Sequence, residues 1–309
     1  EIGTGDWSSD VCSSDLDNLG QWIKELIEEF IAGPENTMEK WDDEPAWAAP
    51  LVGFSSGDDK LYDFYKKDIG EFYVMPNEFM ADAHCKEYKR EDLTVISWIL
   101  PQTDATKADH RKEKYFPSER WARSRIYGEQ INVKLRKHLV AKLKEKGFDA
   151  VGPMISPLWK GARSVRYSFA STWSERHAAY AAGLGTFGLS DALITPKGKA
   201  MRTGSVIVDA VIEPTPRTAK HHNENCLFLM DGSCGKCIER CPIGAITAEG
   251  HDKALCNKYV TMTRSYVPKH YGFDGYGCGF CQTGVPCESG IPNSRKIAEI
   301  GRASCRERV

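Results

Sequence analysis

Apolar residues recur at helical spacing in two long stretches of the chain. In residues 18–32 (NLGQWIKELIEEFIA) they fall every three or four positions, and a Gly-Pro stop signal follows. Residues 117–147 show the same pattern, with Pro117 suited to the first turn and Gly147 to the C-terminal end. The pattern predicts two amphipathic helices, each with one face against a core.

Shorter apolar runs predict strands. They are DLTVISWILP at 92–101, FDAVGPMI at 148–155 and SVIVDAVIE at 205–213. Helices and strands alternate without a repeating β-α unit, so we expect an α+β domain built in layers. The composition changes near residues 215–225, which is the predicted boundary before a cysteine-rich segment.

A glycine-rich stretch lies between the second and third predicted strands. Thr172 and Glu175 have the spacing of a capping box, which predicts a short helix that ends at Gly183. Gly183, Gly185 and Gly188 match the dinucleotide-binding pattern G-x-G-x-x-G. That fingerprint must open a helix, whereas this one closes a helix, so we reject it. We expect the glycines to allow close backbone packing or the approach of a bulky ligand.

Composition adds two constraints. The 309 residues carry a net charge of −2, which predicts attraction neither to nucleic acid nor to a membrane surface. No apolar run approaches the ~20 residues of a spanning helix, so we expect no membrane partner. Eleven cysteines without a secretory signal pattern favour metal binding over disulfides and predict a cytoplasmic protein.

Both ends of the chain are unlike the rest. Residues 1–16 and 299–309 include DWSSDVCSSDL and EIGRASCRERV, which resemble translated sequencing adapters. Neither segment has an apolar face. We expect both to be artefacts, with the natural termini missing; ordinary disordered tails are the alternative.

Cysteine spacing is the most specific chemical signal. Cys234, Cys237 and Cys241, followed by a proline, match the end of the bacterial iron–sulfur run C-x2-C-x2-C-x3-C-P. The place of the first cysteine of that run is taken by Asp231. A carboxylate can bind iron, but it would leave Cys226 without a role. We therefore expect Cys226 to be the displaced first ligand.

Eight cysteines lie between residues 226 and 287. The other three are an isolated Cys85, which we expect to be a structural thiol, and Cys12 and Cys305 in the adapter-like ends. Eight suits two four-cysteine clusters in which the fourth cysteine of a run ligates the other cluster. The first predicted site is Cys226, Cys234, Cys237 and Cys287. The second is Cys241, Cys256, Cys278 and Cys281. Two structural zinc sites are the alternative. The proline, the interleaved short spacing and the neighbouring glycines favour iron–sulfur.

Four segments together carry a resemblance. SERHAAYAAGLGTFG, CGKCIERCPIGAI, ALCNKY and YGCGFCQ resemble the epoxyqueuosine reductase and reductive dehalogenase superfamily of corrinoid-dependent reductases. The resemblance implies a nitroreductase-like α/β-sandwich domain for cobalamin at residues 17–220 and a ferredoxin-like module at 221–298. It also implies two [4Fe–4S] clusters, a cobalamin and a low-potential electron donor of ferredoxin or flavodoxin type. A ferredoxin-like electron carrier without substrate chemistry is the alternative.

The family also suggests individual residues. By position, the cobalamin pocket would include Ser174, Glu175, Gly183, Gly185 and Gly188. Cys256, the lone cysteine of ALCNKY, corresponds to a family cluster ligand, in agreement with the count above.

The family's proton donor has no counterpart at the aligned position. Epoxyqueuosine reductases have an Asp just upstream of the Glu-Arg pair, and that place is held here by Phe169. The nearest candidate donors are Tyr167 and His177, with Arg166 as an electrostatic partner. Dehalogenating relatives are similar in using a Tyr beside a basic residue. The alternatives are a core aromatic and a structural histidine. The substrate, a small molecule or a nucleoside, stays open.

Overall fold

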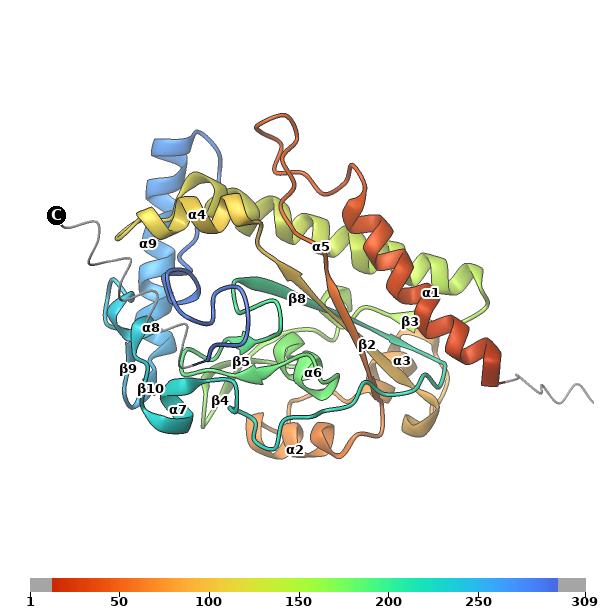
Figure 1. Ribbon diagram of the computed structural model, residues 1–309. Helices are drawn as coiled ribbons and strands as arrows, with labels where there is room; N and C mark the ends of the chain where they lie inside the picture. The colour runs from red at the N-terminus through yellow and green to blue at the C-terminus, as the bar shows by residue number, and fades with distance from the viewer. Residues whose placement is uncertain (1–12, 294–309) are drawn as a thin grey trace, which may run out of the picture.

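The computed structural model describes residues 13–293, and side chains from residue 19 onward (Figure 1). Residues 1–12 and 294–309 lie outside the described residues, and with them most of the predicted adapter-derived ends. Within the described part of the chain, every helix is too short or too polar to cross a lipid bilayer.

A four-stranded antiparallel sheet forms the centre of the molecule. Its strand order is β1-β2-β8-β3. The four strands are β1 (Leu51–Ser56), β2 (Thr94–Pro101), β8 (Met201–Val208) and β3 (Ala150–Val151).

Strand β2 is buried along its whole length because both faces of the sheet are covered. Ile96, Trp98 and Leu100 pack into one apolar core, whereas Val95 packs into a second core on the other face. This alternation follows from the two-residue period of a strand.

Helices form the outer layers (Figure 1). One core contains residues of α1 (Ser13–Ala32) and α5 (Glu119–Glu145). The other contains residues of α2 (Lys60–Ile69), α3 (Pro76–His84) and α6 (Glu175–Ala181). The predicted mixture of helices and strands is confirmed, and the structure shows that the sheet is antiparallel.

Short elements complete the chain. The remaining helices are α4 (Asp104–Lys112), α7 (Leu227–Asp231), α8 (Lys236–Glu239) and α9 (Lys253–Tyr271). The hairpins are β4 (Gly161–Ser164) with β5 (Ser168–Ser171), β6 (Thr186–Phe187) with β7 (Leu193–Ile194), and β9 (Ile246–Thr247) with β10 (Gly250–His251). Single 3₁₀ turns cover Arg90–Asp92, Pro153–Ile155 and Phe280–Gln282.

Two predicted strands are shorter than expected. The run at 148–155 is a strand only at Ala150–Val151, because Pro153, which has no N–H for the ladder, begins a 3₁₀ turn. The run at 205–213 leaves the sheet after Val208. Beyond that point the Thr94 hydroxyl replaces the strand partner: it donates to Ala210 O at 2.7 Å and accepts from Ile212 N.

Two predicted helix starts are also corrected. Helix α5 is capped by Ser118, whose hydroxyl accepts from Trp121 N at 3.3 Å, so Pro117 precedes the helix instead of lying in its first turn. The capping box at Thr172 is wrong, because the Thr172 hydroxyl donates to Leu158 O at 2.9 Å. Helix α6 begins one residue after Ser174.

The cysteine-rich segment packs directly on α4 and α5 (Figure 1). The Arg240 guanidinium donates to Glu113 O at 3.0 Å, and the Tyr271 hydroxyl donates to Pro117 O at 2.8 Å. Tyr276 accepts from Arg125 of α5 at 2.8 Å. The contacts hold the cysteines against the α+β domain.

Candidate metal centre

Each of the eight clustered cysteines is a free thiol, as is Cys85, which is exposed at the end of α3. Turns and short helices present them. Cys226 precedes α7, Cys237 lies in α8 and Cys256 in the first turns of α9. Short elements separated by glycine turns let the chain reverse direction between ligands. Cys12 and Cys305 lie outside the described residues.

We call Cys226, Cys234, Cys237 and Cys287 the first set. Three of its members, Cys226, Cys237 and Cys287, are buried in one apolar cluster with Leu189, Ile194, Ile246 and Val285. Burial raises the pKa of Cys287; Lys199 counteracts this effect, and Cys226 and Cys234 add to it. Cys226, Cys234 and Cys287 are therefore electrostatic neighbours, and Cys237 is a neighbour of Cys287 and Cys226 and also of Cys281.

We call Cys241, Cys256, Cys278 and Cys281 the second set. All four line one cavity of about 240 Å³. Burial raises the pKa of Cys256 to about 11, and Cys281 and Cys241 raise it further. Burial likewise raises the pKa of Cys278 to about 12, with Cys281 as the next cause.

Three arginines line the same cavity from the α+β side. They are Arg125, Arg176 and Arg202. Burial and the charge of Arg125 lower the pKa of Arg202 to about 10, although its Nε lies 3.1 Å from Glu129 Oε2. The arginines bring positive charge to a cavity whose opposite wall carries thiols, which suits an anionic occupant.

The clustered donors are thiols, the ligand type of iron–sulfur clusters and of structural zinc sites. A zinc ion needs its ligands about 2.0–2.3 Å from one centre. Among residues 13–293, no three His, Cys, Asp or Glu side chains converge closely enough to hold one metal ion. In a four-iron cluster each thiolate binds a different iron, so its ligands stand further apart. Asp231 is exposed, and its carboxylate accepts from Ser233 N at 2.9 Å.

Tyr167 has an acidic partner that sequence reasoning missed. Its hydroxyl donates to Asp68 Oδ2 at 2.5 Å, and Arg166 pairs with the same carboxylate. Lys253 Nζ lies 4.9 Å from the centre of the Tyr167 ring. Burial raises the pKa of Tyr167 to about 12, and the Asp68 hydrogen bond adds to the effect. Asp68 comes from α2, so no local pattern could have linked it to Tyr167.

His177 lies deeper than Tyr167. Its Nδ1 shares a 2.7 Å hydrogen bond with Ser174 Oγ, and its ring packs edge-on against Tyr65 with centroids 4.7 Å apart. Burial lowers the pKa of His177 to about 4. The imidazole is therefore neutral near pH 7 and has no imidazolium proton to give.

Among the predicted pocket residues, Glu175 has an internal partner. Its Oε1 lies 3.1 Å from Arg136 Nη2, and both side chains are largely buried. Burial raises the pKa of Glu175, and Arg136 opposes that effect. The pair joins α6 to α5 at the edge of β8, where Arg136 also approaches Thr203 O at 3.4 Å.

Two of the predicted pocket glycines are required by backbone packing. A Cβ on Gly185 would lie 2.4 Å from Ile194 O. Gly183 has a φ of +72°, and a Cβ there would lie 2.9 Å from Pro216 O. No side chain fits at Gly185, and Gly183 combines close contact with a left-handed conformation. With Gly188 and Ser174, they stay predicted cofactor-pocket residues.

No family model matches the chain. It is 32% identical to the epoxyqueuosine reductase of Bacillus cereus over 124 residues, which cover 38% of this chain and 30% of that protein. The identity to the epoxyqueuosine reductase of Staphylococcus aureus is also 32%, with the same coverage. The matches confirm the predicted resemblance to this group of proteins. They span less than a third of the length of these curated relatives.

Solved structures show a weaker overall likeness. An epoxyqueuosine reductase aligns with a TM-score of 0.46 and 20% identity, covering 88% of this chain and 67% of that chain. A catabolic reductive dehalogenase aligns with a TM-score of 0.49 and 14% identity, covering 90% and 38%.

Proposed function

We propose that this chain, a relative of the epoxyqueuosine reductases, is a reductase that uses two cysteine-ligated [4Fe–4S] clusters and a cobalamin. The observation that carries the proposal is the gathering of eight free thiols beside an α+β domain, with four of them around one cavity and three others buried in one apolar cluster. Cysteine-ligated clusters supply single electrons at low potential, and a corrin supplies the reducing chemistry when it is bound.

The two sets would each hold one cluster. The first set is Cys226, Cys234, Cys237 and Cys287, and the second is Cys241, Cys256, Cys278 and Cys281. Support comes from the burial of three first-set thiols in one apolar cluster and from the cavity that the second set lines. The proposed division is a cobalamin and substrate domain at residues 17–220, of nitroreductase-like type, and a ferredoxin-like module at 221–298.

The corrin would lie near α6. The proposed pocket residues, carried over by resemblance, are Ser174, Glu175, Gly183, Gly185 and Gly188. Tyr167 is the preferred proton donor over His177. The phenol stays protonated at neutral pH, Asp68 holds its proton in a fixed direction, and the nearby Lys253 and Arg166 would stabilise a phenolate.

A modified nucleoside is the proposed substrate class because the relatives are named for epoxyqueuosine. Position 169 holds a phenylalanine and no acid, but Asp68 of α2 brings a carboxylate to the same region. A small molecule is the other substrate class. We also propose a ferredoxin or flavodoxin as the electron donor, in the cytoplasm.

The alternative, an electron carrier without substrate chemistry, lacks support. A simple carrier needs little more than its clusters. Here the cysteine-rich segment is bonded to α4 and α5 of a domain of about two hundred residues.

Anaerobic reconstitution tests the cofactors. We expect about eight irons per chain, with absorbance near ~400 nm, followed by tight binding of added cobalamin with a base-off spectrum. Stoichiometric zinc in protein purified without oxygen would contradict the cluster assignment. A protein that holds both clusters but binds no cobalamin would contradict the reductase proposal and favour the electron-carrier alternative.

Single-turnover assays test the proton donor. With an epoxyqueuosine nucleoside as probe, Tyr167→Phe should reduce turnover by roughly 10²-fold or more, whereas His177→Gln should reduce it less. Asp68→Asn should reduce turnover while keeping the fold. Equal activity of Tyr167→Phe and the unaltered protein would exclude Tyr167 as the donor.

A further inference from the structure

Lys199 is a buried cation without a carboxylate partner. Its side chain is only 2% exposed. Its Nζ donates to Ser190 Oγ at 3.3 Å, and its charge lowers the pKa of the neighbouring Cys287 thiol. Within the described part of the chain, no Asp or Glu lies within ion-pair distance of Lys199. An ammonium ion buried beside neutral groups alone would be strongly destabilising.

The missing negative charge is on the cysteines. Burial alone would lower the pKa of Lys199, but Cys287, Cys281, Cys237 and Cys226 raise it by more. Three of these four belong to the first set. The buried ammonium group of Lys199 is therefore balanced when the first set is anionic, as it is when thiolates ligate a cluster.

The backbone fixes Lys199 against the ligand loop. Lys199 N donates to Cys287 O at 2.9 Å. The preceding Gly198 has a φ of +84°, and a Cβ there would lie 2.0 Å from Glu288 O, so the two segments touch along their backbones. This close approach sets the distance from the ammonium ion to the thiols.

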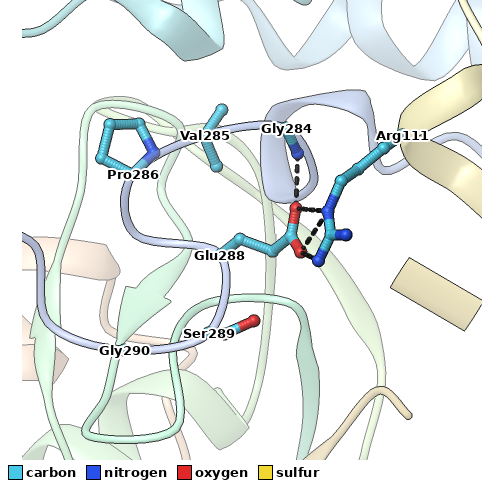
Figure 2. Close-up of a pocket in the computed structure, with 7 residues that line it drawn as sticks. All are labelled: Arg111, Gly284, Val285, Pro286, Glu288, Ser289 and Gly290. Carbon is cyan, nitrogen blue, oxygen red and sulfur yellow. Dashed lines mark hydrogen bonds and ion pairs between the residues drawn. The ribbon is translucent and has the colours of Figure 1, made fainter. Parts of the chain in front are cut away.

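The other side of the same loop is clamped as well. Figure 2 shows the Glu288 carboxylate held by the Arg111 guanidinium and by the Gly284 N–H. Lys107 Nζ donates to Ser289 Oγ at 2.9 Å. Because α4 supplies both basic residues, the loop that carries Cys287 is anchored to the α+β domain and not only to its own segment.

We propose that Lys199 is a built-in counter-charge for the first cluster, which raises the reduction potential of that cluster by more than that of the second cluster. The inference rests on the proposed clusters. Reduction adds one negative charge, and a fixed cation nearby stabilises the reduced form. Net charge, hydrogen bonds to sulfur and solvent exposure are the known determinants of cluster potential, and Lys199 contributes to the net charge.

The test is a potentiometric titration followed by EPR on the reconstituted protein. In Lys199→Met, which keeps the side-chain length but removes the charge, the reduction potential of the first cluster should fall by more than that of the second. The ratio of oxidised to reduced cluster at a given solution potential should change at least tenfold, which is about 59 mV for a one-electron couple. Lys199→Arg should retain the potential. Lys197→Met is the matched control, because Lys197 is exposed two residues away.

Each outcome decides the matter. Unchanged potentials in Lys199→Met with full iron content would overturn the proposal while leaving the clusters intact. If Lys199→Met and Lys199→Gln lose half of the iron while Lys199→Arg keeps it, the counter-charge is supported. Equal iron loss in all three variants would overturn it, because packing would then be the cause. Unaltered protein that takes up no iron would instead contradict the proposed function.

Discussion

The two cysteine sets have the same ligand chemistry and differ in their surroundings, although Cys241 and Cys281 of the second set also touch the apolar cluster of the first. The first set is packed among apolar side chains, and three of its thiols are buried beside Lys199. The second set lines a cavity, its thiols are partly exposed, and three arginines face it. A charge in an apolar region is screened far less than one beside solvent. One buried lysine should therefore have a large effect on the first set for a single charge.

The largest expected effect breaks the first set alone. Cys226→Ala should reduce iron from about eight to about four per chain, because one four-iron site loses a ligand. Asp231→Ala should keep all the iron, since its exposed carboxylate bonds only its own turn. Iron analysis with EPR of the reduced protein measures both. Iron loss in Asp231→Ala with normal loading of Cys226→Ala would reverse the assignment.

The difference in exposure should appear as a difference in lability. When the loaded protein is mixed with an iron chelator, iron release should show two phases of equal amplitude, with the second set emptied first. The reason is that its thiols are partly exposed, whereas three thiols of the first set are buried. Stopped-flow absorbance follows the release. Cys278→Ser should remove the fast phase, and a single phase in the unaltered protein would contradict the comparison.

A third prediction compares one glycine beside each set. Gly279 has a φ of +91°, and a Cβ there would lie 2.0 Å from the Trp121 ring. Gly232 has a φ of +72°, with nothing within 4 Å of such a Cβ. Gly279→Ala should cost about 3 kcal/mol in the free energy of unfolding, since strain and overpacking add. Gly232→Ala should cost about 1 kcal/mol from strain alone. Chemical denaturation measures both, and equal costs would contradict the packing at Trp121.

The smallest effect tests the domain beneath the two sets. Burial lowers the pKa of His177 to about 4, against an ordinary value near 6.5. Between these values the unfolded chain binds more protons than the folded one. The free energy of unfolding should therefore fall as the pH decreases through this window, by up to about 1.4 kcal/mol per pH unit. The stabilising contribution of the neutral His177 is complete above the window. Denaturation of His177→Gln at several pH values should show a shallower slope; an unchanged slope would assign the effect to another group.

Local patterns predicted the parts of the molecule that depend on local physics. The strand at 92–101 and the helix at 117–147 have clear periodicity, and both are present as β2 and α5. The predictions were wrong where a side chain forms a hydrogen bond with a segment distant in the sequence. The hydroxyl of Thr94 bonds the backbone of the chain after Val208, and the Thr172 hydroxyl donates to Leu158 O, in the connection before β4, instead of capping a helix.

The sequence by itself determined the eight clustered cysteines, their proposed division and the α+β character of the domain, because spacing and periodicity are properties of neighbouring residues. Only the tertiary structure decided which charged groups stand beside the chemistry. Asp68 reaches Tyr167 across 99 positions, and Lys199 meets Cys287 from a separate turn. Such pairs arise from packing of distant segments, and neither residue has a neighbour in the chain that marks it.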